Sequence, residues 1–469
     1  MADPNDSGTS GRRRAAAPSA GGRPSPLTLL ALLIPLLTVA ALSLVRPAAT
    51  PVTTHPPTEV DLDRATAVCP ARLPGADDIV LGNTTLASGD LAVRVDGEDT
   101  TETLTSGVGA LDERGEVVVS AEDDLAPGLV VTRAGSGSAT VCSEPAPEQW
   151  FTGVGAAAEH ASTLTLINPD RGPAVADVTV YDGSGVVDVP ALRGLRVPGG
   201  RSATFALADV VPSRDALALG VSVSRGRLGA SVVDVIDPVG RPRPVREWLP
   251  AQAEPSESSY VVGVGTAPAG SVAGRFLTVA NPGDSEVRVE LRLVGLDSEF
   301  APAGVEELRL APESVQEVDL GRVLRGRVAE DVQGVLLDAT APVTATLRTH
   351  VSDDLALAVA GPGVDSEAGV ALPAGAKRIV VAGATAPGVV VLQAWDADGE
   401  EVVSERRVEV EPATATRIRL PDDAVMALVR LGRTSAVVSV EVVDRGLSVL
   451  PLRQLVTTGL LPDVRPAQR

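Results

Sequence analysis

The sequence is poor in the residues that most often carry chemistry. Its 469 residues include only two Cys, three His and nine aromatic residues. It contains no motif for a nucleophilic serine, a zinc-binding His pair or a phosphate-binding glycine loop. The three histidines, His55, His160 and His350, are far apart and share no regular spacing. We therefore predict a non-enzymatic protein with no catalytic residues, no cofactor and no metal site.

Basic residues are also in the minority. Lys and Arg number 40 against 61 Asp and Glu, so the formal net charge is -21 at pH 7. Lys377 is the one lysine, and the Arg residues are scattered among the more numerous carboxylates. A phosphate-binding surface needs a basic stripe or patch. The composition therefore predicts no nucleic-acid partner.

One acidic run has a spacing that could suit a metal. The segment is Asp396-Ala397-Asp398-Gly399-Glu400, and its alternating carboxylates resemble half of a calcium-binding loop. The matching turn of an earlier copy of the repeat, Asp182-Gly183-Ser184-Gly185, lacks the second carboxylate. A hairpin turn explains both segments, so we predict a turn here and not a calcium site.

The amino terminus predicts a membrane anchor. A polar cytoplasmic tail, residues 1–26, carries four Arg ahead of an uncharged stretch, residues 27–45. A helix of that length nearly spans the hydrocarbon layer, and the preceding Arg residues favour a cytoplasmic amino terminus. Residues 46–65, rich in Pro and Thr, are expected to form an extracytoplasmic spacer. A cleaved signal peptide is the alternative, with Ala41-Leu42-Ser43 as the cleavage site.

The two cysteines predict a structural disulfide. Cys69 and Cys142 both lie in the first segment after the spacer, residues 66–147. Outside the cytoplasm two such cysteines are expected to pair, and a bridge between them would join the first strand of a domain to its last.

The rest of the chain contains repeats. Trp150-Phe151-Thr152-Gly153-Val154-Gly155, Tyr260-Val261-Val262-Gly263-Val264-Gly265 and Ile379-Val380-Val381-Ala382-Gly383-Ala384 are read as the openings of three copies. The first two copies share a strand that ends in Asn-Pro, at Asn168 and Asn281, and the third is interpreted as having lost it. The copies are predicted to occupy residues 148–250, 258–373 and 377–455, with a carboxyl-terminal tail at 456–469.

The repeats favour an all-β fold. Period-two alternation of apolar and polar residues, as in Val287-Arg288-Val289-Glu290-Leu291, is typical of half-buried antiparallel strands. Turn residues recur about every 8 to 12 positions, which is typical of sandwiches. We predict tandem immunoglobulin-like β-sandwich repeats behind one amino-terminal transmembrane helix. Short Pro-containing linkers favour a rod or curved stack, and Trp248 is expected to pack between two neighbours.

Four aromatic residues are the candidates for a ligand site. They are Trp150, Tyr181, Tyr260 and Trp395. Sugar-binding sites commonly need exposed aromatic rings, so these residues would form a glycan platform if they lay on an open face. Their recurrence at equivalent places in the repeats favours packing roles instead.

The chain also resembles a known family. The features are Cys142-Ser143-Glu144-Pro145 ahead of Trp150-Phe151, the strand end Ile167-Asn168-Pro169 and the turn Val197-Pro198-Gly199-Gly200. With one amino-terminal span and an extracytoplasmic β-repeat region, the chain is similar to domain-of-unknown-function family 5719, from high-GC Gram-positive bacteria. The resemblance implies no catalytic residues and an association with genes for envelope polysaccharides.

These features together predict a function. We expect a non-enzymatic, membrane-anchored extracytoplasmic protein with a structural or interaction role in the cell envelope. The partner would be an envelope protein or a glycan. The alternative is a glycan-binding accessory protein in envelope polysaccharide assembly.

Overall fold

The computed structural model describes residues 26–44, 57–74, 78–135, 137–237, 243–252, 254–263, 272–324, 326–351 and 353–461. Residues 59–461 form one compact unit, here called the body, and the segments before and after it form another. The predicted cytoplasmic tail, apart from Pro26, lies outside the described residues, as do residues 45–56 of the predicted span and spacer.

The amino-terminal segment contains one helix, α1 (Pro26–Leu44), with Pro35 inside it. Among the described residues, no helix is both long enough and apolar enough to cross a membrane. The predicted membrane span is therefore not confirmed.

The body is built from four units of similar strand order, with a terminal pair of strands, β1 (Thr58–Asp61) and β35 (Thr458–Leu461). The first unit contains β2 (Arg64–Cys69), β3 (Asp78–Asn83), β4 (Gly89–Val95), β5 (Glu98–Leu104), β6 (Val108–Asp112), β7 (Val117–Glu122), the 3-10 helix η1 (Asp123–Leu125), β8 (Leu129–Gly135) and β9 (Ser138–Val141). The second contains β10 (Glu148–Val154), β11 (His160–Ile167), β12 (Ala174–Asp182), β13 (Gly185–Val187), η2 (Pro190–Leu192), β14 (Leu195–Val197), β15 (Ser202–Ala206), α2 (Leu207–Val210), β16 (Leu217–Arg225), β17 (Gly229–Ile236) and β18 (Val245–Leu249).

The third unit contains β19 (Ser256–Val262), β20 (Val272–Ala280), β21 (Val287–Gly295), β22 (Glu299–Phe300), β23 (Leu308–Leu310), β24 (Val315–Asp319), α3 (Gly326–Asp331), β25 (Val332–Val351) and β26 (Asp354–Gly361). The fourth contains β27 (Glu367–Ala371), β28 (Ala376–Ala382), β29 (Gly388–Trp395), β30 (Glu401–Val410), β31 (Ala415–Arg419), β32 (Met426–Gly432), β33 (Val437–Val443) and β34 (Leu447–Pro451).

The same strand order recurs in every unit. In the first unit one sheet has the order β2-β7-β4-β5 and the other the order β6-β3-β8-β9. The corresponding orders in the fourth unit are β27-β32-β29-β30 and β31-β28-β33-β34. In the third unit one long strand, β25, takes the place of both the sixth and the seventh strands of the other units. Because β25 pairs with β21 in one sheet and with β20 in the other, the two sheets are continuous.

The all-β prediction is confirmed, but the immunoglobulin-like order is not. In an immunoglobulin sandwich the first strand pairs with the second. Here the first strand pairs with the sixth, as β2 does with β7 and β10 with β16. Each first strand also bridges to the chain at or after the last strand, through the pairs Val68–Ser143, Trp150–Gln252, Tyr260–Gly361 and Ala368–Gln454. The two sheets of a unit are therefore tied together along one edge.

Aliphatic side chains fill the cores, as the alternating pattern predicts. Along β11 the side chains alternate between buried and half-buried positions, and Leu164 and Leu166 are fully buried against the second sheet. Burying one such side chain stabilises a fold by roughly 1.5–3 kcal/mol. With few large rings available, each core depends on many Val, Leu and Ala contacts.

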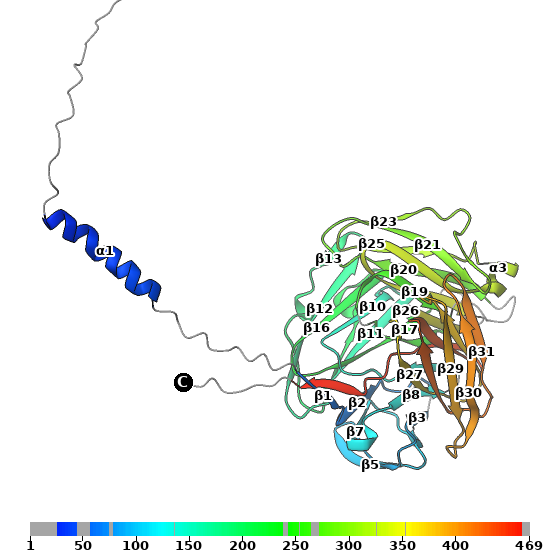
Figure 1. Cartoon of the computed structure of the whole chain (residues 1–469). Coiled ribbons are helices and arrows are strands. Elements are labelled where there is room, and N and C mark those ends of the chain that lie inside the picture. Colours follow the sequence, from blue (N-terminus) through cyan, green and yellow to red (C-terminus); the bar gives the residue numbers. More distant parts are fainter. Residues whose placement is uncertain are drawn as a thin grey trace, which may run out of the picture. The chain divides into compact units, whose positions relative to one another are not determined.

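The four units close into a ring. Their last strands contact one another in the cyclic order β9, β18, β26, β34 and back to β9. Figure 1 shows the units around this centre in chain order, from the blue and cyan first unit to the orange and red fourth unit. The predicted rod or curved stack is therefore wrong, because the fourth unit packs against the first.

Each last strand also completes the core of the preceding unit. Leu355 of β26 joins the core of the second unit, and Val449 of β34 joins that of the third. Ala139 of β9 joins the core of the fourth unit. Trp248 of β18 packs on Leu73 of the first unit, which confirms the expectation that it lies between neighbours.

The chain ends reinforce the closure. β1 and β35 pair, the Leu62 amide donates to the Thr457 carbonyl at 2.8 Å, and the Thr458 hydroxyl donates to the Glu59 carboxylate at 2.8 Å. Segments predicted as a spacer and a tail thus contribute strands to the body. Strand pairing uses backbone N–H and C=O groups, so the exposed β1 can pair with β35 although its side chains show no buried face.

The third sequence repeat begins one strand earlier than predicted. Trp150 and Tyr260 lie on first strands, whereas Ile379 lies on β28, the second strand of its unit. The first strand of that unit is β27, upstream of residue 377. The strand that seemed lost is therefore present, with Gly383 where the second and third units have Asn168 and Asn281.

The presence of glycine at this position in the fourth unit, in place of asparagine, has a packing reason. Asn168 donates from its side chain to the Gly172 and Val197 carbonyls, at 2.8 and 3.0 Å, and so fixes the chain after β11. Gly383 instead lies under the Tyr260 ring, and a Cβ built there would be 2.7 Å from ring atoms. The aromatic contact and the asparagine side chain cannot occupy the same place.

The disulfide prediction is confirmed. Cys69 at the end of β2 is bonded to Cys142, directly after β9, so the bridge joins the first strand of its unit to the last. Replacing both residues with Ser should lower the melting temperature, since a 73-residue separation corresponds to about 4 kcal/mol in the chain-entropy model. Thermal melts with and without reductant provide the test. Reductant should shift the wild type toward the double variant and leave that variant unchanged, and an unshifted wild type would contradict the prediction.

A second prediction concerns Gly383. Its φ of +69° disfavours a side chain, and the Tyr260 ring leaves no room for one. Gly304 is a matched control, because its φ is +80° but no atom lies within 4 Å of a Cβ built there. Gly304→Ala should cost about 1 kcal/mol from backbone strain, whereas Gly383→Ala should cost a further 1–3 kcal/mol from overlap. Equal unfolding free energies for the two variants, measured by denaturant titration, would show that the contact does not matter.

Candidate functional site

The four aromatic candidates lie at contacts between units. Trp150 and Tyr181 form a tilted pair with ring centroids 5.8 Å apart, at the contact between the second and third units. Ala280 and Val315 of the third unit complete that cluster. Trp395, 5% exposed, packs on Val130 at the contact between the fourth unit and the first.

Tyr260 occupies the corresponding place between the third and fourth units. Its ring covers Gly383, and its hydroxyl donates to a Glu299 oxygen at 3.1 Å. Burial, with the Glu299 charge adding to it, raises the pKa of Tyr260 to about 12. The phenol therefore keeps its proton at physiological pH and serves as a hydrogen-bond donor.

The exposure of the four rings bears on their role. Tyr181 and Trp395 are at most 8% exposed, and Trp150 and Tyr260 are half-buried. A sugar platform needs a ring face open to solvent, which the two buried rings do not offer. The structure thus brings Trp150 and Tyr181 together, but it distributes the four rings over three contacts between units.

A polar cluster near the contact between the second and third units contains Ser, His and Asp, the residue types of a serine hydrolase. His160 Nδ1 lies 2.7 Å from the Asp215 carbonyl oxygen, and Nε2 lies 2.9 Å from Asp234 Oδ1. The Ser162 hydroxyl donates to the same Asp234 oxygen at 2.5 Å and accepts from the Gly155 amide at 2.9 Å. Strands β11 and β17 position all three side chains, because Ser162 pairs with Asp234 in the ladder.

The geometry of this cluster is not that of acyl transfer. A nucleophilic serine must donate to the histidine, which in turn donates to the carboxylate. Here the serine and the histidine both bond to the carboxylate, and Asp234 is fully buried. Both imidazole nitrogens face acceptors, so the ring acts as a clamp between Asp215 and Asp234. We interpret the cluster as structural.

Arg348 extends this clamp into the third unit. Its Nη1 lies 3.2 Å from His160 Nδ1, its Nη2 donates to Glu317 at 2.8 Å, and its guanidinium lies 5.5 Å from the centre of the Phe276 ring. The ion pair with Glu317 lies within the third unit, where it helps to position the guanidinium. The contact of the Arg348 guanidinium with His160 joins the third unit to the second.

Two carboxyl groups meet at the centre of the ring. Glu247 on β18 is 2% exposed; it accepts from the Trp248 amide at 2.8 Å and lies 3.1 Å from the Ser448 hydroxyl of β34. Asp354, at the start of β26, accepts from the Leu447 amide at 2.8 Å. Ser448 also donates to the Gly137 carbonyl of the first unit at 3.2 Å. All four units therefore meet at these groups.

Burial controls the protonation of both acids. It raises the pKa of Glu247 well above its usual value, and the nearby Asp354 charge raises it further. Burial likewise raises the pKa of Asp354 to about 6, although amide donors oppose the shift. The pair therefore takes up protons in the folded protein more readily than in the unfolded chain.

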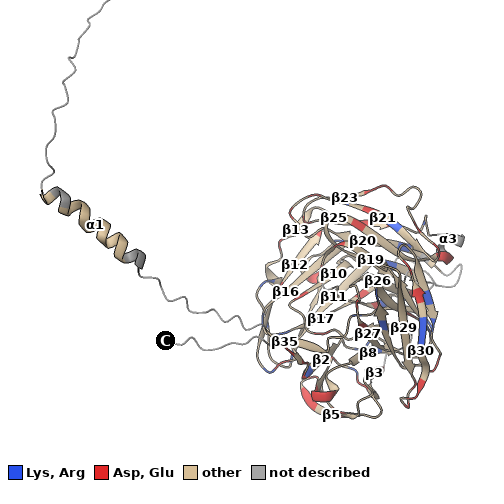
Figure 2. Ribbon diagram, in the orientation of Figure 1, with Lys and Arg blue, Asp and Glu red and all other residues tan. Residues whose placement is uncertain are grey.

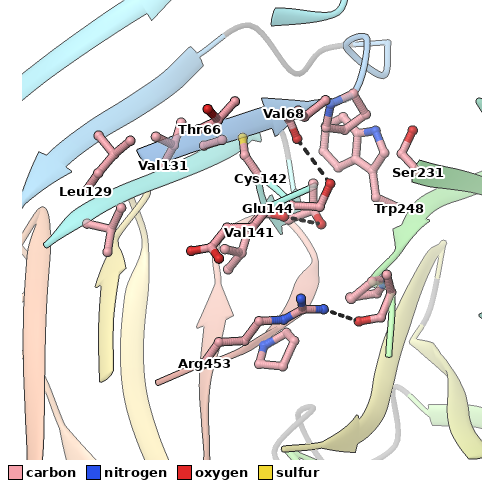
Figure 3. Close-up of a pocket in the computed structure, with 18 of the residues that line it drawn as sticks. Thr66, Val68, Leu129, Val131, Val141, Cys142, Glu144, Ser231, Trp248 and Arg453 are labelled. Carbon is pink, nitrogen blue, oxygen red and sulfur yellow. Dashed lines mark hydrogen bonds between the residues drawn. The ribbon is translucent and has the colours of Figure 1, made fainter. Parts of the chain in front are cut away.

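The candidate ligand site is a cavity where the ends of β9, β18 and β34 converge (Figure 3). Its volume is about 80 Å³, and its walls come from the first, second and fourth units. Trp248 forms part of the wall and donates from Nε1 to the Ala71 carbonyl at 3.3 Å. Glu144 and Arg453 also face the cavity, from the segments that follow β9 and β34.

The two charged groups of the cavity are not paired directly. Arg453 donates to the Ala251 carbonyl at 2.5 Å, and no Arg453 nitrogen forms an ion pair with Glu144 within 4.0 Å. Burial raises the pKa of Glu144 and lowers that of Arg453, and in each case the other group's charge partly opposes the shift. The cavity thus presents one carboxylate and one guanidinium without a direct contact between them.

Glu144, Glu247, Asp354 and Arg453 were not predicted as site residues, yet the sequence contains signals for some of them. Arg453 interrupts an apolar carboxyl-terminal stretch. Glu247 shares the inward face of its strand with Val245 and Leu249, two residues away on either side. Glu144 lies in the Cys142-Ser143-Glu144-Pro145 run on which the family resemblance rests, but nothing in that run indicates a ligand site. The acidic run at Asp396 forms the predicted turn, and its Oδ1 accepts from the Asp398 and Glu400 amides at 3.0 and 2.9 Å.

The central acid pair makes stability depend on pH. A carboxyl whose pKa is raised by folding contributes stability below its unfolded pKa, and that contribution is lost as pH rises through the folded value. The melting temperature should therefore rise as pH falls from about 8 to about 5, the range around the folded pKa of Asp354. Glu247→Gln should melt higher than the wild type at pH 8 and depend less on pH. Glu257→Gln, an exposed control, should follow the wild type, and identical pH profiles for all three proteins would refute the explanation.

Comparison with known proteins places the chain in a family. No curated protein matches it. A solved structure described as "Structure of infectious bursal disease virus Gx strain" aligns with 92% of this chain and 87% of that chain, at 10% identity and a TM-score of 0.11, which supports no argument. The model of the "Family of unknown function (DUF5719)" matches residues 77–421, most of the chain, from β3 of the first unit to β31 of the fourth. The resemblance inferred from the sequence is thereby confirmed, and the chain belongs to the DUF5719 family.

Proposed function

We propose that the chain is a non-enzymatic protein with a structural or interaction role in the cell envelope, held at a membrane by its amino-terminal segment. The closed ring is the observation that carries this proposal. The aromatic candidates and the His160 cluster, which could otherwise form a binding platform or a catalytic site, hold neighbouring units together. A ring fixed in this way can present its outer strands in constant positions.

The extracytoplasmic location is supported by two features. The Cys69–Cys142 disulfide is of the kind that persists in oxidising compartments. The uncharged residues 27–45 follow an Arg-rich segment, and membrane attachment rests on this sequence pattern alone.

The outer edges are the surfaces available to a partner. β5 and β30 are edge strands with mostly exposed residues, and Figure 2 shows acidic and basic residues interspersed over the body, with basic residues on β30. Charges on an edge strand oppose indiscriminate pairing with other strands. A partner would therefore be selected by charge complementarity as well as by strand geometry.

Photo-crosslinking in cells tests the proposal. The full chain would carry a photo-reactive amino acid at Thr101 on β5 or at Arg407 on β30, both exposed, and unirradiated cells would be the control. We expect mass spectrometry to find the same envelope protein attached in independent preparations. Attachment of polysaccharide would favour the glycan-binding alternative, and recovery of the chain alone from both positions would contradict an interaction role.

A further inference from the structure

We propose that the cavity between Glu144 and Arg453 binds a small zwitterion, with a free α-amino acid as the ligand class. The carboxylate of the ligand would pair with Arg453 and its ammonium group with Glu144. This site is independent of the interaction role proposed above, because it uses none of the outer strands.

The first argument is the arrangement of charge. Arg453 and Glu144 carry opposite charges and face the same cavity, but they form no ion pair with each other. Arg453 uses one N–H on the Ala251 carbonyl, and a guanidinium has five. A planar guanidinium suits a carboxylate, for which it can donate two parallel hydrogen bonds. One ligand with both charges would satisfy both side chains, whereas a simple anion or cation would satisfy only one.

The second argument is desolvation. Burial disfavours the charged form of each group, and the partial opposition between the two charges does not cancel that effect. The effect is strongest for Arg453, which is half-buried, because a charge that has lost solvent binds an opposite charge more strongly than an exposed one does; Glu144 is exposed and gains less. The carboxylate of a ligand would therefore give Arg453 the close opposite charge that Glu144 does not provide.

The third argument is the size and position of the cavity. Its volume of about 80 Å³ exceeds the roughly 30 Å³ share of one liquid water and suits a molecule of a few heavy atoms. Its other walls include Val68, Leu129 and Trp248, which would contact the short apolar part of an amino acid. Clefts between domains are common ligand sites. The walls come from three units, so a bound ligand would also hold the ring closed.

Calorimetric titration of the full-length chain with glycine, L-alanine and D-alanine tests the proposal. Acetate and methylammonium, which each carry one of the two charges, are the comparison ligands. We expect at least one amino acid to bind at least roughly tenfold more tightly than either single-charge ligand, and to raise the melting temperature with concentration. No binding of any amino acid, or acetate binding as well as the amino acids do, would overturn the proposal.

Variants separate the site from the fold. Glu144→Gln keeps the size of an exposed side chain and should weaken amino-acid binding at least roughly tenfold without lowering the melting temperature of the free protein. Glu148→Gln makes the same charge change four residues later, at an exposed position, and should bind as the wild type does. Arg453→Gln should also abolish binding, but it removes a bond to Ala251 and so needs the Glu144 variant beside it. Unchanged binding by Glu144→Gln would refute the assignment.

Discussion

Packing of each unit's last strand into the core of its neighbour is the contact on which the rest of the structure depends. Leu355 belongs by sequence to the third unit but lies in the core of the second, and Ala139 of the first unit lies in the core of the fourth. A unit taken alone would leave an apolar surface without cover, so each unit needs the next. Because the fourth unit also needs the first, the array closes.

Closure explains why polar groups are buried between units. The His160–Asp234 clamp meets Arg348 across one contact, and Glu247 meets Ser448 at the centre. Such groups lose water on assembly and regain hydrogen bonds only in the correct register. These polar groups make the contacts between units specific for one register, whereas aliphatic side chains alone would pack with less selectivity for register. The same burial covers the cluster of Ser162, His160 and Asp234, whose hydrogen bonds are not those of a catalytic triad.

Much of the local structure followed from the sequence. Alternation of apolar and polar residues identified strands such as β21, and a pair of distant cysteines identified the disulfide between the first and last strands of a unit. The register of the last repeat was misjudged because Gly383 replaces the asparagine that marks this strand in other units, and its neighbours Ile379 and Val380 resemble a first strand. The aromatic residues recurred at equivalent places, yet only the contacts distinguish an aromatic residue that packs between units from one that faces solvent.

The sequence by itself determined the fold class, the repetition of one β-rich unit, the disulfide and the family, because each of these is written in local spacing or composition. Tertiary structure alone decided that the units close into a ring, that the first strand pairs with the sixth, and that Glu144 and Arg453 face one cavity. The physical reason is that these features depend on contacts between residues far apart in the sequence. Periodicity shows that a side chain is buried but not which neighbour covers it, and residues more than 300 positions apart meet only after all four units have packed.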